Sequence, residues 1–187
     1  MTQKITPKQA QQILDESDLI YSKDEIDAAY ERMSVAISAV IADKNPLVVC
    51  ILNGGLVPLG GLITRLNFPL QLDYLHASRY RGNTTGGELI WIARTQHTLK
   101  NRVVLLVDDI LDEGHTLDAI IKDCYINGAQ HVYSAVLLEK KLEKKKAIQA
   151  DFVGLEVEDR YVFGCGMDYK EYHRNLPGVH AIKECEP

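Results

Sequence analysis

Four acidic side chains lie close together in the stretch VVLLVDDILDEGHTL, residues 103–117; they are Asp108, Asp109, Asp112 and Glu113. The apolar residues before them predict a buried strand that ends near Val107, and the residues after them predict a helix over 116–125. Carboxylates at a strand end accept hydrogen bonds from vicinal hydroxyls, as on a ribose, or hold a magnesium ion. Free N–H groups at the start of a helix attract a phosphate dianion. The stretch therefore suits a ligand with both a diol and a phosphate.

The rest of the turn fits the same chemistry. Gly114 allows close backbone approach or a positive φ angle, and His115 and Thr116 offer donors. Asp112 lies between the two ends, where it could act as a general base. Glu113 would repel a phosphate, so we expect its backbone to face the phosphate and its side chain to face water. The alternative is a solvated acidic turn in which Asp112 or Glu113 only caps the helix.

The first third of the chain predicts helices. Thr6-Pro7 opens a short helix, because proline fits the first helical turn. Ser22 and Glu25 form a capping box before a longer helix, whose apolar residues recur at helical spacing. Asn45-Pro46 ends that helix.

From Leu47 onward, short apolar runs predict strands: LVVCIL, LQLDYLHA, ELIWIA, RVVLLVDD, HVYSAVLLE, DFVGLEV and YVFGCGM. Helical stretches follow the first run, at 56–66, and the fourth run, at 116–125. This alternation predicts an α/β fold with a mostly parallel central sheet and flanking helices on both faces. Ligands bind such sheets at the carboxyl ends of the strands. That rule directs attention to residues 53–55, to residues 108–116 and to Lys140.

Composition limits the class of protein. The 187 residues fit one domain, and the net charge of -5 argues against a protein that coats nucleic acid. The N-terminus lacks the apolar core of a signal peptide, and no apolar run approaches the ~20 residues that span a bilayer. The four cysteines, Cys50, Cys124, Cys165 and Cys185, form no CxxC pair. A reducing, cytoplasmic compartment is the simplest interpretation.

Two common nucleotide motifs are absent. No lysine follows the glycine of the acidic turn, so the GxxxxGK[ST] loop of nucleoside triphosphatases is missing. NGGLVPLGG does not match GxGxxG, so a dinucleotide-binding fold has no support.

VVLLVDDILDEGHTL closely resembles the phosphoribosyl pyrophosphate (PRPP) motif of type I phosphoribosyltransferases. Other landmarks occur in the order of the 6-oxopurine branch, the hypoxanthine(-guanine) phosphoribosyltransferases: LNGG at 52–55, SRYRGNTTGG at 78–87, and YVFGCGMDYKEYHR at 161–174. The likeness runs from about residue 47 to residue 179. It implies a single phosphoribosyltransferase domain over 1–187, with a small hood built from terminal segments and a flexible catalytic loop at about 78–87.

On the PRPP side, the resemblance implies that Asp108 and Asp109 hold the ribose hydroxyls and organise Mg2+. Asp112 would be the base at the purine N7. The 5′-phosphate would be bound by Glu113, Gly114, His115 and Thr116. The pyrophosphate would be bound by Leu52, Asn53, Gly54, Arg79 and Arg174. Many relatives carry lysine where this chain has Asn53, so that contact would depend on backbone amides; a non-proline cis peptide would fall at Leu52-Asn53.

On the base side, the resemblance implies that Lys140 donates to the purine 6-oxo group, which favours hypoxanthine or guanine over adenine. Asp168 would be the ligand of a second metal ion. The purine would be held by Lys140, Tyr161, Val162 and Met167, with Tyr161 stacked on the ring. Plainer interpretations stay open: LNGG as an ordinary glycine-rich turn, Arg79 and the lysines after Lys140 as solvated cations, and Tyr161 as core.

The implied reaction is transfer of the phosphoribosyl group from PRPP to N9 of hypoxanthine or guanine, giving IMP or GMP and pyrophosphate in purine salvage. We expect Mg2+ as cofactor, a homodimer or homotetramer, and no membrane or nucleic-acid partner. One alternative is a PRPP-sensing, nucleic-acid-binding regulator of the same fold. Another is a xanthine-preferring phosphoribosyltransferase.

Overall fold

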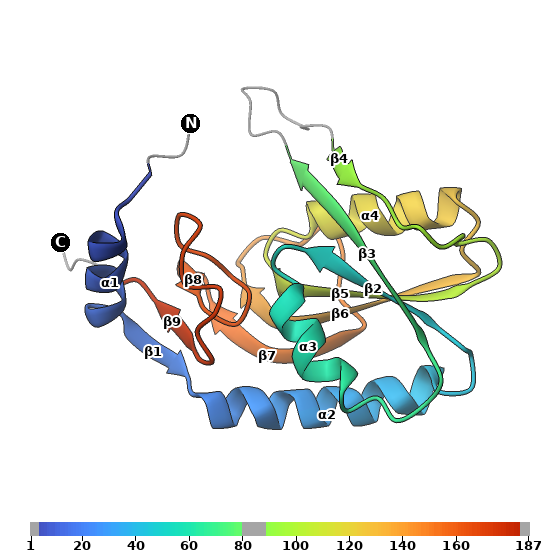
Figure 1. Cartoon of the computed structure of the whole chain (residues 1–187), viewed down its shortest axis with the longest axis horizontal. Coiled ribbons are helices and arrows are strands. Elements are labelled where there is room, and N and C mark those ends of the chain that lie inside the picture. Colours follow the sequence, from blue (N-terminus) through green and yellow to red (C-terminus); the bar gives the residue numbers. More distant parts are fainter. Residues whose placement is uncertain (1–3, 80–88, 184–187) are drawn as a thin grey trace.

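The computed structural model describes residues 4–79 and 89–183 and has an α/β architecture (Figure 1). Its larger sheet has six strands in the order β4-β3-β2-β5-β6-β7. Their bounds are β2 (Leu47–Leu52), β3 (Gln71–Arg79), β4 (Leu89–Ala93), β5 (Val103–Leu111), β6 (His131–Lys141) and β7 (Phe152–Glu158). All neighbouring pairs are parallel except β3 with β4 at one edge. The predicted mostly parallel sheet is confirmed.

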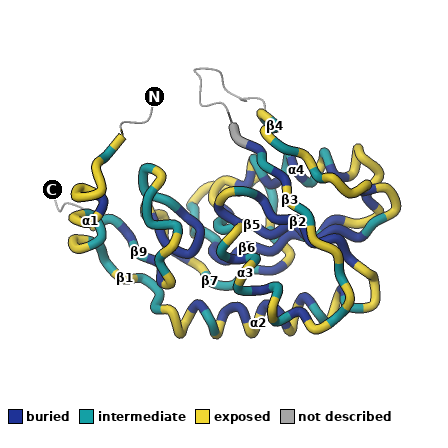
Figure 2. The backbone as a smooth tube through the Cα atoms, viewed as in Figure 1, coloured by how far each residue is buried: buried dark blue, intermediate teal, exposed yellow. Residues whose placement is uncertain are grey.

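Helices cover both faces of this sheet. The helices α2 (Lys23–Ile41) and α3 (Leu56–Ile63) lie on one face, where Ile37 and Leu62 join Val48 and Leu105 in a core cluster. The helix α4 (His115–Ile126) lies on the other face, and its apolar residues pack on a second cluster of strand residues. Figure 2 shows the buried residues concentrated in the strands between the helices. This double cover explains why the central strands β2, β5 and β6 have continuous buried runs rather than alternating ones.

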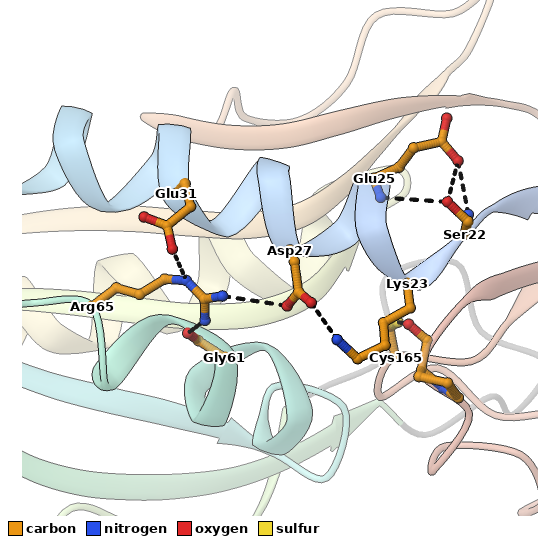
Figure 3. A network of polar contacts seen from close by, with 9 residues as sticks. Ser22, Lys23, Glu25, Asp27, Glu31, Gly61, Arg65 and Cys165 are labelled. Atoms are coloured by element: carbon orange, nitrogen blue, oxygen red, sulfur yellow. Dashed lines mark hydrogen bonds and ion pairs between the residues drawn. The ribbon is translucent and has the colours of Figure 1, made fainter.

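Arg65 joins α2 to the segment that follows α3, as Figure 3 shows. Its guanidinium donates to Glu31 Oε1 at 2.7 Å, to Gly61 O at 2.6 Å and to Asp27 Oδ1 at 3.3 Å. At the start of α2, Ser22 and Glu25 form the predicted capping box. The helix that follows the loop after β2 is therefore held by several polar contacts as well as by the core.

A second, three-stranded sheet in the order β1-β9-β8 lies at one end of the larger sheet. It consists of β1 (Asp18–Tyr21), β8 (Val162–Phe163) and β9 (Val179–Ala181), and α1 (Pro7–Asp15) lies beside it (Figure 1). We call these elements, with the turns between β8 and β9, the hood. The predicted hood of terminal segments is confirmed.

Several predicted boundaries are wrong. The first third is not only helical, because β1 lies there and pairs with β9, a long-range partner that local periodicity cannot reveal. The helix predicted over 56–66 ends at Ile63. The strand predicted to end near Val107 continues to Leu111, since its pairing with β6 continues as far as Leu111 and Glu139. The predicted capped helices at Thr6 and Ser22 are confirmed.

Candidate active site

The paired acids Asp108 and Asp109 lie inside the last part of β5, partly buried. The Asp109 N–H donates to Asp108 Oδ1 at 2.9 Å, and the Ile110 N–H donates to Asp109 Oδ1 at 2.8 Å. Burial, reinforced by the neighbouring Asp109 carboxylate, raises the pKa of Asp108, and burial likewise raises the pKa of Asp109. A bound cation or a hydroxyl donor would therefore stabilise the charged form of these two carboxylates.

The loop after β2 meets these acids directly. A Cβ at Gly54 would lie 2.0 Å from Asp109 Oδ2, so the carboxylate occupies the space that any other side chain would fill. Since β2 and β5 are neighbouring parallel strands, with Cys50 opposite Val107, both motifs end at the same edge of the sheet. The Leu52-Asn53 peptide is cis, as the resemblance implies.

The hood closes on the same loop from the other side. Gly166 has a φ of 105°, and a Cβ there would lie 2.1 Å from Gly54 O. The Gly166 carbonyl accepts from Arg174 Nη1 at 2.5 Å, and Arg174 Nη2 also donates to Asp168. Arg174 lies near enough to the β5 acids to lower the pKa of both, against the effect of their burial. Gly54 thus meets Asp109 on the sheet side and Gly166, which accepts from Arg174, on the hood side.

Asp168, the expected ligand of a second metal ion, has its carboxylate occupied by protein donors. Arg174 binds one oxygen, and the Glu171 N–H donates to the other at 2.7 Å. Within 4–79 and 89–183, no three His, Cys, Asp or Glu side chains form a group that could hold a metal ion. The structure therefore does not unite Asp108, Asp109 and Asp168 into one set of ligands.

The start of α4 matches the expected phosphate site in its backbone. Its N-cap is Gly114, with a φ of 82°, and glycine has no side chain that could cap the first N–H groups of the helix. The Asp118 N–H makes the first helical bond, to Gly114 O at 2.9 Å, so the N–H groups before it remain outside the helical ladder. His115 and Thr116 form the first turn. The Glu113 side chain is exposed, as expected, and it also pairs with Lys144.

Asp112 and Lys140, predicted from separate motifs, lie together. Lys140 Nζ is 3.5 Å from Asp112 Oδ2 and donates to Asp159 Oδ1 at 3.2 Å. Only 14% of the Lys140 side chain is exposed, so its ammonium is directed at these acids. Lys140 is the last residue but one of β6 and pairs opposite Val157, so it lies at the carboxyl end of the strand as predicted.

Three of the residues expected at the purine lie in the hood, in β8 and the turns beside it. Tyr161 is half-exposed and donates to Asp168 O at 3.2 Å, and its ring packs edge-on against Tyr169. Val162 and Met167 are buried. Tyr161 therefore presents a ring surface to solvent instead of belonging to the core. Arg79 is the last residue of β3, and the rest of the expected loop at 78–87, from Tyr80 on, lies outside the described residues.

Comparison with known proteins gives the family. The phosphoribosyl transferase domain model matches residues 17–171. The chain belongs to this family. This phosphoribosyltransferase is 32% identical over 167 residues to the hypoxanthine-guanine phosphoribosyltransferase of Bacillus subtilis, covering 88% of this chain and 92% of the relative. It is 29% identical to the hypoxanthine-guanine-xanthine phosphoribosyltransferase of Tritrichomonas foetus, covering 89% and 91%.

Solved structures agree. A hypoxanthine phosphoribosyltransferase from Staphylococcus aureus superposes with a TM-score of 0.86 at 28% identity, covering 91% of this chain and 94% of that one. The resemblance to the 6-oxopurine branch is confirmed, and the alternative of a nucleic-acid-binding regulator is not favoured.

Three residues that shape this site were not among the predicted site residues: Asp159, Gly166 and Lys144. Asp159 follows β7, which pairs with β6, so its place beside Lys140 depends on a strand order that the apolar runs alone do not give. Gly166 and Lys144 gave weaker signals, because their partners Gly54 and Glu113 are distant in sequence.

Proposed function

We propose that the protein transfers the phosphoribosyl group from PRPP to N9 of hypoxanthine or guanine, releasing pyrophosphate and giving IMP or GMP, as a purine-salvage enzyme formed by one domain over 1–187. The observation that carries this proposal is the 3.5 Å approach of Lys140 Nζ to Asp112 Oδ2 beside the start of α4. A donor for a 6-oxo group and an acceptor for a ring N–H thus stand together next to a phosphate-binding helix start.

Each part of the site has a separate role in the transfer. Asp112 accepts the N7 proton while N9 attacks, and Lys140 donates to the 6-oxo oxygen. Asp108 and Asp109 hold the ribose hydroxyls, and their negative charge favours the positive charge that develops on the sugar. The amides of residues 113–116 hold the 5′-phosphate, and Tyr161 stacks on the base. Because both substrates are held in line, much of the acceleration comes from orientation.

Magnesium fits this site as a cofactor. The carboxylates of Asp108 and Asp109 are hard oxygen donors, and their raised pKa values reflect mutual crowding and burial that a cation relieves. Held by these two carboxylates, the ion would supply positive charge that neutralises the pyrophosphate leaving group. The Asp168 carboxylate, held by Arg174, would contribute only after that pair opens.

The decisive experiment measures product formation from PRPP and Mg2+ with hypoxanthine, guanine, xanthine and adenine offered separately. We expect turnover of the first two and none of adenine, whose 6-amino group gives Lys140 no acceptor. Preferred turnover of xanthine would favour the alternative specificity. Turnover of adenine would contradict the role of Lys140, and no turnover of any base would contradict the proposed function.

Asp112→Asn tests the base. We expect kcat to fall by about 100-fold or more, because the amide cannot take a proton, with a much smaller change in the KM for PRPP. Asp118→Asn, in the first turn of α4 and paired with Lys122, is the matched control. Equal activity of Asp112→Asn and the control would remove Asp112 from the mechanism.

We also propose self-association and a reducing, cytoplasmic location. Leu56, Leu72 and Tyr74 are exposed and line an apolar pocket of about 400 Å³ next to Cys50 and Leu52. An apolar surface of this kind favours burial against a second copy. Cys50 is a buried free thiol, as are Cys124 and Cys165. Light scattering during size-exclusion chromatography, with Leu72→Glu as the test variant, decides whether the protein self-associates. No helix of the described part is long and apolar enough to cross a bilayer.

A further inference from the structure

The basic run of residues 140–146, which ends β6 and continues past it, is not simply solvated. Four of its lysines are paired with acids: Lys140 with Asp112 and Asp159, Lys141 with Glu156 and Glu158, Lys144 with Glu113, and Lys146 with Glu139. Among these, the pair of Lys144 and Glu113 lies in the turn that precedes α4. It therefore bears on the 5′-phosphate rather than on the base.

Backbone contacts fix the segment after Lys144 onto the same turn. The Ala147 N–H donates to the Glu113 carbonyl at 2.9 Å. A Cβ at Gly114 would lie 3.2 Å from the backbone N of Ile148, so these two segments of the chain are in close contact at the start of α4. Lys144 thus approaches Glu113 from a segment that is itself attached to the phosphate turn.

Glu113 creates an electrostatic conflict that this arrangement resolves. Its carboxylate is one residue before Gly114, the N-cap of α4, where a phosphate dianion would bind. Two anions at such short range repel each other, and water screens this repulsion only in part because about half of the Glu113 side chain is exposed. The ammonium of Lys144 is hydrogen-bonded to Glu113 Oε1, while His115 Nε2 lies 3.9 Å from the other oxygen. The carboxylate is therefore directed toward Lys144 and carries a counter-charge.

We propose that Lys144 is a positioning residue for the 5′-phosphate: it neutralises Glu113 and holds that carboxylate away from the amides at the start of α4. This inference rests on the proposed function, because it takes the turn of residues 113–116 as the phosphate site. Lys144 acts through Glu113 and touches no reacting atom.

The test combines direct titration and kinetics. Lys144→Gln should raise the Kd and the KM for PRPP by up to about fivefold, and the Kd for IMP similarly, while kcat stays unchanged. Binding of pyrophosphate alone should not change, since it lacks a 5′-phosphate. Lys144→Arg should restore the affinity. The matched control is Lys145→Gln, which removes the same charge one residue further along the chain.

A double-mutant cycle separates this role from direct phosphate binding. In a Glu113→Gln background, Lys144→Gln should have little further effect, because the charge that needed compensation is gone. Persistence of the full effect in that background overturns the proposal, as does an effect no larger than that of Lys145→Gln.

The titrations also separate the proposal from the proposed function. If the unmodified protein binds PRPP and IMP but turns over no base, the proposed function fails, and the cycle still decides the role of Lys144. If the unmodified protein binds neither ligand, both fail.

Discussion

The two halves of the site are built in different ways. On the sheet side, Asp109 and Gly54 meet because β2 and β5 are neighbouring parallel strands in fixed register. On the hood side, Gly166 and Arg174 are placed by consecutive tight turns without a continuous ladder of strands. The sheet half is held by the regular hydrogen bonding of paired strands, whereas the hood half depends on a few specific contacts.

The hood turns carry a cost that the sheet does not. Positive φ angles occur at four non-glycine residues between β8 and β9, namely Cys165, Lys170, Glu171 and His173. A left-handed conformation costs roughly 1–2 kcal/mol for a residue with a side chain. The contact of Gly166 with Gly54, and the bond of Arg174 to Gly166, offset this cost. The conformation of the hood is therefore stabilised by its contact with the sheet half.

Of the substitutions that compare the two halves, Gly54→Ala on the sheet side should cause the largest loss of activity. The new Cβ would lie 2.0 Å from Asp109 Oδ2, so the carboxylate must leave its position. We expect kcat/KM to fall by about 100-fold or more, because a displacement of about 1 Å at reacting groups costs that much. Steady-state kinetics with PRPP measure the loss.

Gly60→Ala is the matched control, since Gly60 lies in α3 with nothing within 4 Å of an added Cβ. Activity should be unchanged, and stability should rise by about 0.5–1 kcal/mol because alanine favours the helix. If Gly54→Ala behaves like this control, Asp109 is not fixed by the loop as described.

The second effect should follow Gly166→Ala, on the hood side. Alanine there combines an unfavourable φ of 105° with a contact of 2.1 Å to Gly54 O. We expect about 2–4 kcal/mol of lost stability, seen as a fall in Tm of about 5–15 °C. Calorimetry with and without PRPP measures it. An unchanged Tm would mean that the hood does not need its contact with the sheet half.

The difference between the sheet half and the hood half also explains which parts of the site the sequence could predict. Apolar runs and parallel pairing were enough to place Asp108, Asp109, Asp112 and Lys140 at one edge of the sheet, because strand ends follow from burial and topology. The cis peptide at Leu52-Asn53 and the hood roles came from resemblance alone. Periodicity carried no information on β1, nor on the contact between Gly166 and Gly54. Both join segments more than 100 residues apart and depend on tertiary packing.

The smallest effect concerns His180, in β9 of the hood. Its ring stacks on Phe163 at a centroid distance of 5.6 Å, and its Nδ1 lies 3.1 Å from Ser17 Oγ. Burial, with a smaller contribution from His173, lowers the pKa of His180 below its ordinary value of 6.5. In the unfolded chain the ring takes up its proton at higher pH than in the folded protein. The stabilisation is therefore complete above about pH 6.5 and is lost as the pH falls through the lower, folded pKa.

His180→Gln should consequently be less stable than the unmodified protein at pH 7.5, where stacking is lost, and the difference in Tm should shrink toward pH 5. His131→Gln, at the start of β6, is the control on the sheet side. A thermal-unfolding series in one buffer system over this range measures the trend. A deficit that stays constant with pH would show that His180 contributes packing only.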